Sequence, residues 1–372
     1  MHNALFNLGF RPFFLLGSVF TAVAMALWSG PLFPTAVLWH AHEMIYGFAT
    51  AIIAGFLLTA VRNWTGIMTP HGLELAGLTG LWLAARLMSL VAETVTWAAR
   101  LDALFLLFLL AAVAWPIYQV RQWRQWGILA CLAFLLLGQL FFLLGVTNLF
   151  ATGERIGIQL GLFAILGLIF IIGGRVIPFF TERGVGYSLT ITRFPWLERW
   201  FMPVFTLFAV LTILFPGSIP SRLLALALAA LHLVRLWGWY SHGIWRKPLL
   251  WVLHLAYLWL IVGFLLVTAD LTGLAIHAWA VGGLGGMIIG MICRVSLGHT
   301  GRNIHQPPTA VTLLFALVFT AALLRTAFPW LLPQFSILWY RLAGIGWIAA
   351  FLGFLWWYAP MLWQPRADGK PD

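Results

Sequence analysis

Charged side chains are scarce in this sequence of 372 residues: Asp, Glu, Lys and Arg make up 8% of it, whereas 62% is hydrophobic. Soluble domains carry about 25% charged residues, so this composition excludes a soluble globular protein. The 10 acidic residues are outnumbered by 21 Lys and Arg, which gives a formal net charge of +11. Because the basic residues lie between apolar runs, this charge does not indicate nucleic acid as a partner.

Cysteine is nearly absent as well. Cys131 and Cys293 both lie in apolar runs, which excludes a disulfide framework and a thiolate metal site. No Cys-x-x-Cys-His motif occurs, so any haem is expected to be b-type, held by axial ligation without a covalent link. Long polar segments are also missing, and no connection between apolar runs is long enough for a soluble domain.

Repeated apolar runs of about 20 residues predict an all-α polytopic membrane protein, because a helix of that length crosses the hydrocarbon core of a bilayer. We expect one transmembrane helical domain over residues 1–363 and a disordered cytoplasmic tail over residues 364–372. The twelve predicted transmembrane helices span residues 12–29, 39–61, 72–91, 101–120, 127–149, 157–179, 200–215, 222–241, 249–268, 274–297, 309–327 and 337–359.

Lys and Arg are distributed unevenly between the two sets of connections. Most of them lie on one side, and the positive-inside rule makes this side cytoplasmic, together with both termini. The opposite side holds few basic residues. This orientation places the start of the predicted span 39–61 at the outer surface. Arg86 is an exception, because it lies within a predicted span.

The chain contains an internal repeat. A shift of 235 residues places His42 on His277 and gives six identities over 25 residues without a gap, which links span 39–61 to span 274–297. A weaker match at a shift of 119 residues adds span 157–179. These spans are four apart in the chain, which indicates three four-helix units in a pseudo-threefold array.

Two histidines and a carboxylate, His40, His42 and Glu43, stand at the start of the second span. Ionisable groups at a membrane helix are costly and are therefore candidates for function. A separation of two residues rotates a helical side chain by about 200°, so His40 and His42 can serve two different centres, haem or copper. Glu43 is either a partner that orients an imidazole, a proton carrier, or a solvated carboxylate at a helix N-terminus.

His277 lies at the start of the equivalent span, whose glycines would allow a flat macrocycle to approach. Because the repeat makes His42 and His277 equivalent, we expect both imidazoles to ligate one haem near the outer surface. The alternative for His277 is an interfacial histidine at a helix start. Arg325 and Arg341 flank the last outer loop, where they either pair the haem propionates or are ordinary loop arginines.

Three further histidines are candidate metal ligands. His232 and His254 lie inside two consecutive predicted spans, where solvation does not explain them, and we expect them to form part of a second, deeper site. His299 lies in a glycine-containing turn beside the predicted inner surface. Predicted spans 4 to 7 hold no histidine, so any metal site must draw on the first and last thirds of the chain.

Four motifs together resemble the NnrS family: residues 10–14 (FRPFF), 39–44 (WHAHEM), 175–181 (RVIPFFT) and 297–302 (LGHTGR). The resemblance extends over nearly the whole chain. It implies a multi-pass protein of the bacterial inner membrane that holds haem and copper and is linked to nitric oxide and nitrosative stress.

The twelve spans are also similar to the catalytic subunit of haem–copper oxidases and nitric oxide reductases. In that superfamily, spans 2 and 10 supply the axial histidines of a low-spin haem, and His42 and His277 match this pattern. The superfamily's copper ligands on spans 6 and 7 have no counterpart here. The similarity therefore does not imply oxidase-type reduction of oxygen.

These observations favour a haem- and copper-containing membrane protein that binds or turns over nitric oxide, with electrons from an unidentified donor. Acidic groups at membrane depth are expected to be nearly limited to Glu43 and Asp270, which makes Glu43 the candidate catalytic proton carrier. The alternative is a non-enzymatic carrier or sensor of haem, copper or nitric oxide. A secondary transporter is the third choice, because transporters place ionisable groups near the bilayer midplane, whereas here we expect them at helix ends.

Overall fold

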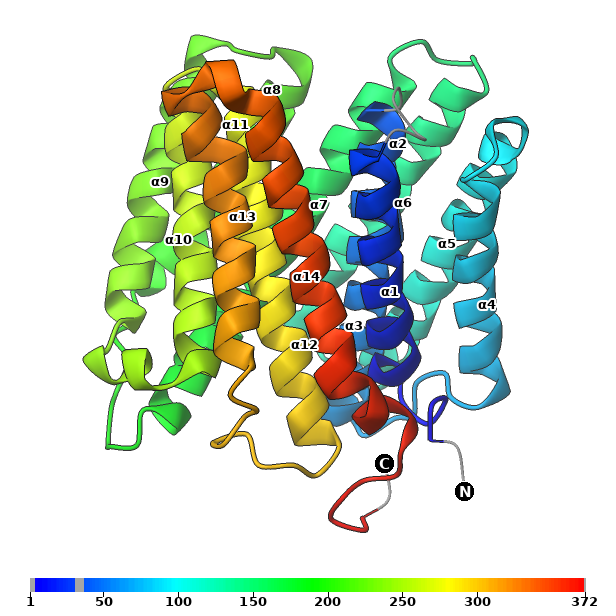
Figure 1. Ribbon diagram of the computed structural model, residues 1–372, viewed down its shortest axis with the longest axis vertical. Helices are drawn as coiled ribbons and strands as arrows, with labels where there is room; N and C mark the ends of the chain where they lie inside the picture. The colour runs from blue at the N-terminus through cyan, green and yellow to red at the C-terminus, as the bar shows by residue number, and fades with distance from the viewer. Residues whose placement is uncertain (1–3, 31–36, 371–372) are drawn as a thin grey trace. The chain divides into compact units, whose positions relative to one another are not determined.

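The structure is a computed structural model that describes residues 4–30 and 37–370 (Figure 1). All the regular elements of these residues are helices, and no strand occurs among them. Eleven helical segments of the described chain are long and apolar enough to cross a membrane. The prediction of an all-α, multi-pass membrane protein is therefore confirmed.

One predicted span is shorter in the structure than the other eleven. The span expected over residues 72–91 is helix α4, Leu73–Met88. Its 16 residues are about 24 Å long at 1.5 Å per residue, whereas the hydrocarbon core is about 30 Å thick. α4 is therefore a membrane-associated helix that falls short of a full span by length.

Contacts within the chain define two compact units, whereas the repeat had indicated three four-helix units. Unit 1 comprises residues 1–168, 295–302 and 355–372, and unit 2 comprises residues 169–294 and 303–354. Three helices contribute residues to both units: α7 (Gly153–Gly184), α12 (Gly286–His299) and α14 (Ser336–Trp363).

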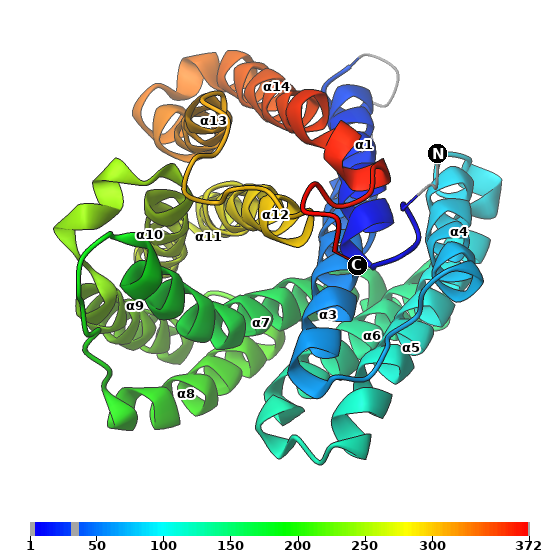
Figure 2. The ribbon, with the colours of Figure 1, turned by 90° about the horizontal axis from the view of Figure 1, so that it is seen from below.

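Unit 1 is built mainly from the first five membrane helices. In Figure 2, α4, α5 and α6 lie side by side; α4 packs against α5, α5 against α6, and α1 against α3. The elements of this unit are α1 (Phe10–Ser29), α2 (Val37–His42), η1 (Glu43–Ala49), α3 (Thr50–Thr65), α4, η2 (Ala92–Thr94), α5 (Val95–Gln119), η3 (Trp123–Gln125) and α6 (Trp126–Val146).

Unit 2 is organised around α10, which packs against α9 and η5, while η5 also packs against α13. Aromatic rings fill its interior, and Trp279 donates a hydrogen bond from Nε1 to the Leu260 carbonyl at 3.0 Å. The elements of this unit are α8 (Pro195–Leu214), α9 (Ile219–Trp239), η4 (His242–Arg246), α10 (Pro248–Thr268), α11 (Thr272–His277), η5 (Ala278–Gly285), α13 (Val311–Leu331) and η6 (Pro333–Phe335).

Arg11, from the first of the four motifs, closes the C-terminal end of α14 within unit 1. Its buried Nη1 donates to the carbonyls of Met361, Leu362 and Gln364 at 3.3, 2.9 and 2.8 Å. These carbonyls belong to the end of a helix, where acceptors have no partner within the helix itself. The FRPFF motif therefore has a structural role in this fold.

The tail for which we predicted disorder begins beyond α14. Here Ala367 donates its backbone N–H to the Thr300 carbonyl at 2.9 Å, and Arg366 Nη1 donates to the His299 carbonyl at 3.1 Å. The last two residues, 371–372, lie outside the described residues.

Replacing Arg11 by Ala is expected to lower the free energy of unfolding by about 1–3 kcal/mol, because buried carbonyls lose a charged donor. Thermal unfolding in detergent measures the change. Arg199→Ala is the matched control, since Arg199 is exposed on α8. Equal losses from the two variants would contradict the structural role of Arg11.

Candidate functional site

Two π-helical turns mark the helices that the sequence repeat connects. η1 begins directly after His42, and η5 begins directly after His277. π-helical turns are rare and occur frequently at functional sites. α7, the third and weaker member of the repeat, is α-helical throughout. The π-helical turns thus support the equivalence of His42 and His277 in the sequence repeat. α7 lacks such a turn.

In unit 1, His42 lies at the centre of a set of polar side chains that we call the buried charge cluster. Its Nδ1 lies 2.9 Å from Glu43 Oε1, and its Nε2 lies 3.0 Å from Gln139 Oε1 on α6. Asp102 Oδ2, on α5, lies 3.8 Å from the same Nε2. Both nitrogens of the His42 ring are therefore engaged by neighbouring oxygens.

Arg86 of α4 completes the buried charge cluster. Its Nη1 donates to Glu43 Oε2 and its Nη2 donates to Asp102 Oδ1, so one guanidinium bridges two carboxylates. Burial is nearly complete: His42 is 4% exposed, Glu43 0%, Arg86 2% and Asp102 1%. A solvated Glu43 at a helix N-terminus is thereby excluded.

The lack of a side chain at Gly47 leaves room for the buried charge cluster. A Cβ atom on Gly47 would lie 2.7 Å from Arg86 Nη1, so a larger residue at this position would displace the guanidinium. Tyr46 fixes the same turn from the other side by donating its hydroxyl to the Gly157 carbonyl of α7 at 2.6 Å. The π-helical turn η1 therefore contributes the Glu43 carboxylate and, at Gly47, leaves the space that the Arg86 guanidinium occupies.

The His40 ring leaves its helix in another direction from His42, as a separation of two residues predicts. It stacks on Trp28 of α1, with ring centroids 4.6 Å apart and an interplanar angle of 13°. His40 is half-buried. Its surroundings are aromatic, whereas those of His42 are ionic.

In unit 2, His277 is half-buried at the end of α11. Its Nδ1 donates to the Gly273 carbonyl at 2.9 Å. Arg325 of α13 lies close enough to His277 to interact electrostatically, and its guanidinium carbon lies 3.8 Å from the centroid of the Tyr340 ring. Arg341 is exposed. The structure therefore associates His277 with Arg325.

His232 and His254 are both buried, but they have separate partners. His232 Nδ1 lies 2.7 Å from the Tyr257 hydroxyl, which also accepts a hydrogen bond from Arg235 at 2.9 Å. His254 Nδ1 lies 3.0 Å from the Leu250 carbonyl, and its Nε2 lies 3.4 Å from the carbonyl at the end of α9. These contacts do not support a single site for both histidines.

His299 lies in unit 1, with its ring centroid 5.6 Å from that of Phe10. The turn that contains it supplies the carbonyls that bind the C-terminal tail. Two of the motifs, residues 10–14 and 297–302, therefore meet in a structural contact. A metal at His299 stays a prediction.

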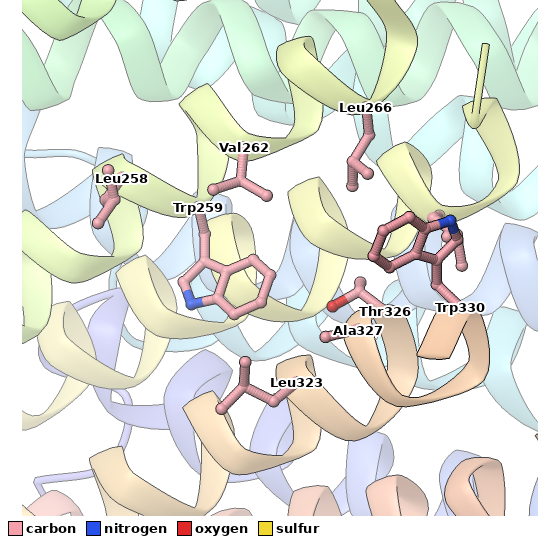
Figure 3. Close-up of a pocket in the computed structure, with 9 residues that line it drawn as sticks. Leu258, Trp259, Val262, Leu266, Leu323, Thr326, Ala327 and Trp330 are labelled. Carbon is pink, nitrogen blue, oxygen red and sulfur yellow. The ribbon is translucent and has the colours of Figure 1, made fainter. Parts of the chain in front are cut away.

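An apolar groove of about 410 Å³ lies between α10, α11 and α13 of unit 2. Figure 3 shows Thr326 and Ala327 between the rings of Trp259 and Trp330. The Thr326 hydroxyl donates to the Ala322 carbonyl at 2.6 Å and so offers no donor to a ligand. The groove fits a hydrocarbon chain better than a polar substrate.

A protein-bound copper ion needs several donors that converge. No group of three or more His, Cys, Asp or Glu side chains arranged to hold a metal occurs within residues 4–30 and 37–370. Copper held by such a group therefore does not fit the described residues. Haem requires less, because one imidazole nitrogen can hold its iron. A nitrogen of this kind is Nε2 of His277, whose Nδ1 donates to the Gly273 carbonyl.

The comparison with protein families agrees with the motifs. A family model described as NnrS protein matches residues 4–366, which is nearly the whole chain. No curated protein matches the sequence. The family match includes both units and every histidine discussed above.

Proposed function

The chain belongs to the NnrS family, and on this basis we propose that it is a membrane haem protein that binds or turns over nitric oxide in defence against nitrosative stress. Family membership supports the link to nitric oxide stress. The multi-pass helical architecture supports a location in the membrane, where nitric oxide, a small apolar gas, can arrive through the lipid. The bacterial inner membrane, with both termini in the cytoplasm, is part of this proposal.

The hydrogen bond of the His277 ring to Gly273, together with the nearby Arg325, carries the haem assignment. A carbonyl oxygen can only accept a hydrogen bond, so Nδ1, which faces the Gly273 carbonyl, carries the hydrogen. The lone pair of the neutral ring is therefore on Nε2. Histidines that ligate metals commonly donate their other nitrogen to a backbone carbonyl in this way, which fixes the ring and raises its basicity.

Bound haem would supply an iron centre with affinity for nitric oxide. His277 would hold that iron through Nε2, and the hydrogen bond to Gly273 would orient its ring. Arg325, whose position is fixed by Tyr340, would pair with a propionate. Arg341 is available for the second propionate at the surface.

We do not assign the iron to His42. Ligation by His42 would break its contact with Glu43 or with Gln139 inside a buried ionic network. The proposal thus differs from the bis-histidine haem that the repeat predicted, because His277 alone would hold the iron. Copper stays an expectation of the family resemblance, without residues assigned to it.

Spectroscopy of the purified protein tests this proposal. We expect a Soret band that shifts on addition of nitric oxide, with one equivalent bound per haem. Sustained consumption of nitric oxide by protein supplied with an electron donor would identify an oxidoreductase. Uptake that stops at one equivalent would identify a carrier or sensor. Protein produced with sufficient haem that shows no Soret band would overturn the proposal.

A further inference from the structure

We propose that the buried charge cluster holds one transferable proton inside the membrane, carried by His42 and accepted by Asp102. The ligand of this site is the proton itself. The inference goes beyond the haem assignment and stands without it, because all the residues concerned lie in unit 1 and none is assigned to iron.

The hydrogen-bond partners of His42 place a hydrogen on each of its ring nitrogens. Gln139 donates from Nε2 to the Ala99 carbonyl at 3.1 Å, which turns its Oε1 toward His42 Nε2. The other nitrogen, Nδ1, faces a carboxylate oxygen of Glu43. Amide and carboxylate oxygens accept, so both nitrogens donate and the ring is an imidazolium.

The charge balance of the cluster requires the same proton. Glu43 and Asp102 bring two negative charges into the interior of unit 1, and Arg86 compensates one of them. Buried charges persist in proteins when they are paired. Without this proton one carboxylate would be uncompensated, whereas a His42 imidazolium makes the cluster neutral.

One atom of the cluster is ready to receive the proton. Both oxygens of Glu43 and Oδ1 of Asp102 already accept hydrogen bonds. Asp102 Oδ2 is buried without a hydrogen-bond partner among the described residues, and it lies 3.8 Å from His42 Nε2. An unsatisfied buried carboxylate oxygen is costly and calls for a specific explanation.

The transfer is balanced without any redox partner. When the 3.8 Å between His42 Nε2 and Asp102 Oδ2 shortens to hydrogen-bond distance, the Nε2–H bond breaks and an O–H bond forms at Oδ2, so an ion pair becomes two neutral groups. After the transfer, the Nε2 lone pair would face Gln139 Oε1, which repels it. The proton therefore resides mainly on His42, and Asp102 holds it transiently.

Neighbouring elements of unit 1 each contribute a side chain or a backbone carbonyl to the surroundings of the cluster. Tyr46 is the further titratable neighbour, and its hydroxyl is directed to the Gly157 carbonyl. Phe142 stacks on His42 with centroids 4.2 Å apart. The contributions are Arg86 from α4, Asp102 from α5, Gln139 and Phe142 from α6, Glu43 and Tyr46 from η1, Phe20 from α1, and a backbone carbonyl from α7.

Nitrogen NMR of the full-length protein, labelled with ¹⁵N-histidine and reconstituted in phosphatidylcholine vesicles, tests the proton on His42. We assign the His42 signals by their loss in His42→Gln. The wild type at neutral pH should show two protonated ring nitrogens for His42. In Asp102→Asn, which removes one carboxylate charge, one of these two signals should be lost and a neutral ring should remain.

Asp270→Asn is the matched control, because Asp270 is exposed and lies 3.6 Å from Arg222 of unit 2. It should leave both His42 signals unchanged. A neutral His42 ring in the folded wild type would overturn the proposal even if Asp102→Asn fails to fold. The Soret band of the same samples is recorded separately, so the failure of the haem proposal and the failure of this one are distinguishable.

Discussion

Arg86→Gln is expected to lower the free energy of unfolding by about 3–5 kcal/mol, the largest loss of stability that we predict for a single substitution. The guanidinium of Arg86 bridges Glu43 and Asp102 in the interior of unit 1. Its removal leaves two buried carboxylates with only His42 to compensate them. Removing one partner of a buried ion pair destabilises a protein more than replacing both partners by apolar residues, because the remaining charge is uncompensated.

A double variant separates charge from packing. Arg86→Gln combined with Asp102→Asn removes one charge of each sign and should recover a large part of the stability lost in Arg86→Gln. Denaturation in mixed micelles measures both losses. Arg100→Gln is the control, because Arg100 is exposed at the start of α5. A loss below about 1 kcal/mol in Arg86→Gln would mean that the bridge is not the stabilising contact.

The helices themselves were readable from the sequence, because the membrane requires long apolar runs whose backbone is satisfied within each helix. Two helix starts carry a local signal, because α8 begins at Pro195 and α10 at Pro248, where a missing N–H costs nothing. The predicted spans began at residues 200 and 249, so this signal was missed for α8. The predicted length of α4 was too great, because the apolar pattern continues after Met88 although the helix ends there.

The buried charge cluster was only partly readable. The sequence identifies Glu43 and His42 as ionisable groups at a membrane helix, yet the expectation that acids at membrane depth are nearly limited to Glu43 and Asp270 was wrong. Asp102 is buried in α5, whereas Asp270 is exposed. One signal could have revealed the pair: an arginine within a predicted span needs an acid, and Asp102 lies on the next helix.

Other partners in the cluster are set by packing that no local pattern encodes. Gln139 lies 97 positions from His42 in the sequence, and its orientation depends on the Ala99 carbonyl of another helix. The π-helical turns were likewise unpredicted, although the repeat had already aligned the residues that begin them. The glycines that the two turns share in the alignment, Gly47 and Gly282, are buried in the structure.

Ionisable groups are also buried within the helices of unit 2, whereas the sequence predicts polar groups at helix ends and therefore disfavours a secondary transporter. His232 lies 13 residues into α9, about 20 Å along the helix, and Arg235 one turn further. Arg235 forms two hydrogen bonds with Glu198, at 2.8 and 2.6 Å, which anchor it in unit 2. These residues are held by fixed structural partners, so their depth alone does not favour transport.

His277→Gly is expected to reduce the haem content of the purified protein at least tenfold. The substitution removes the imidazole to which we assign the iron, through its Nε2, and a haem without covalent links depends on that ligand for its attachment. The pyridine haemochrome assay gives haem per protein. Imidazole added during purification should restore the Soret band, because it can enter the space vacated by the side chain and supply the missing nitrogen.

His71→Ala is the control for His277→Gly. His71 also has its Nδ1 3.1 Å from a backbone carbonyl, that of Thr69, but it lies exposed in the loop between α3 and α4. Its loss should leave the haem content unchanged, since the tautomer alone does not make a site.

Arg325→Ala should retain haem but weaken its binding, because the proposed propionate contact is lost while Nε2 remains. Full haem content in His277→Gly without imidazole would show that another residue holds the iron.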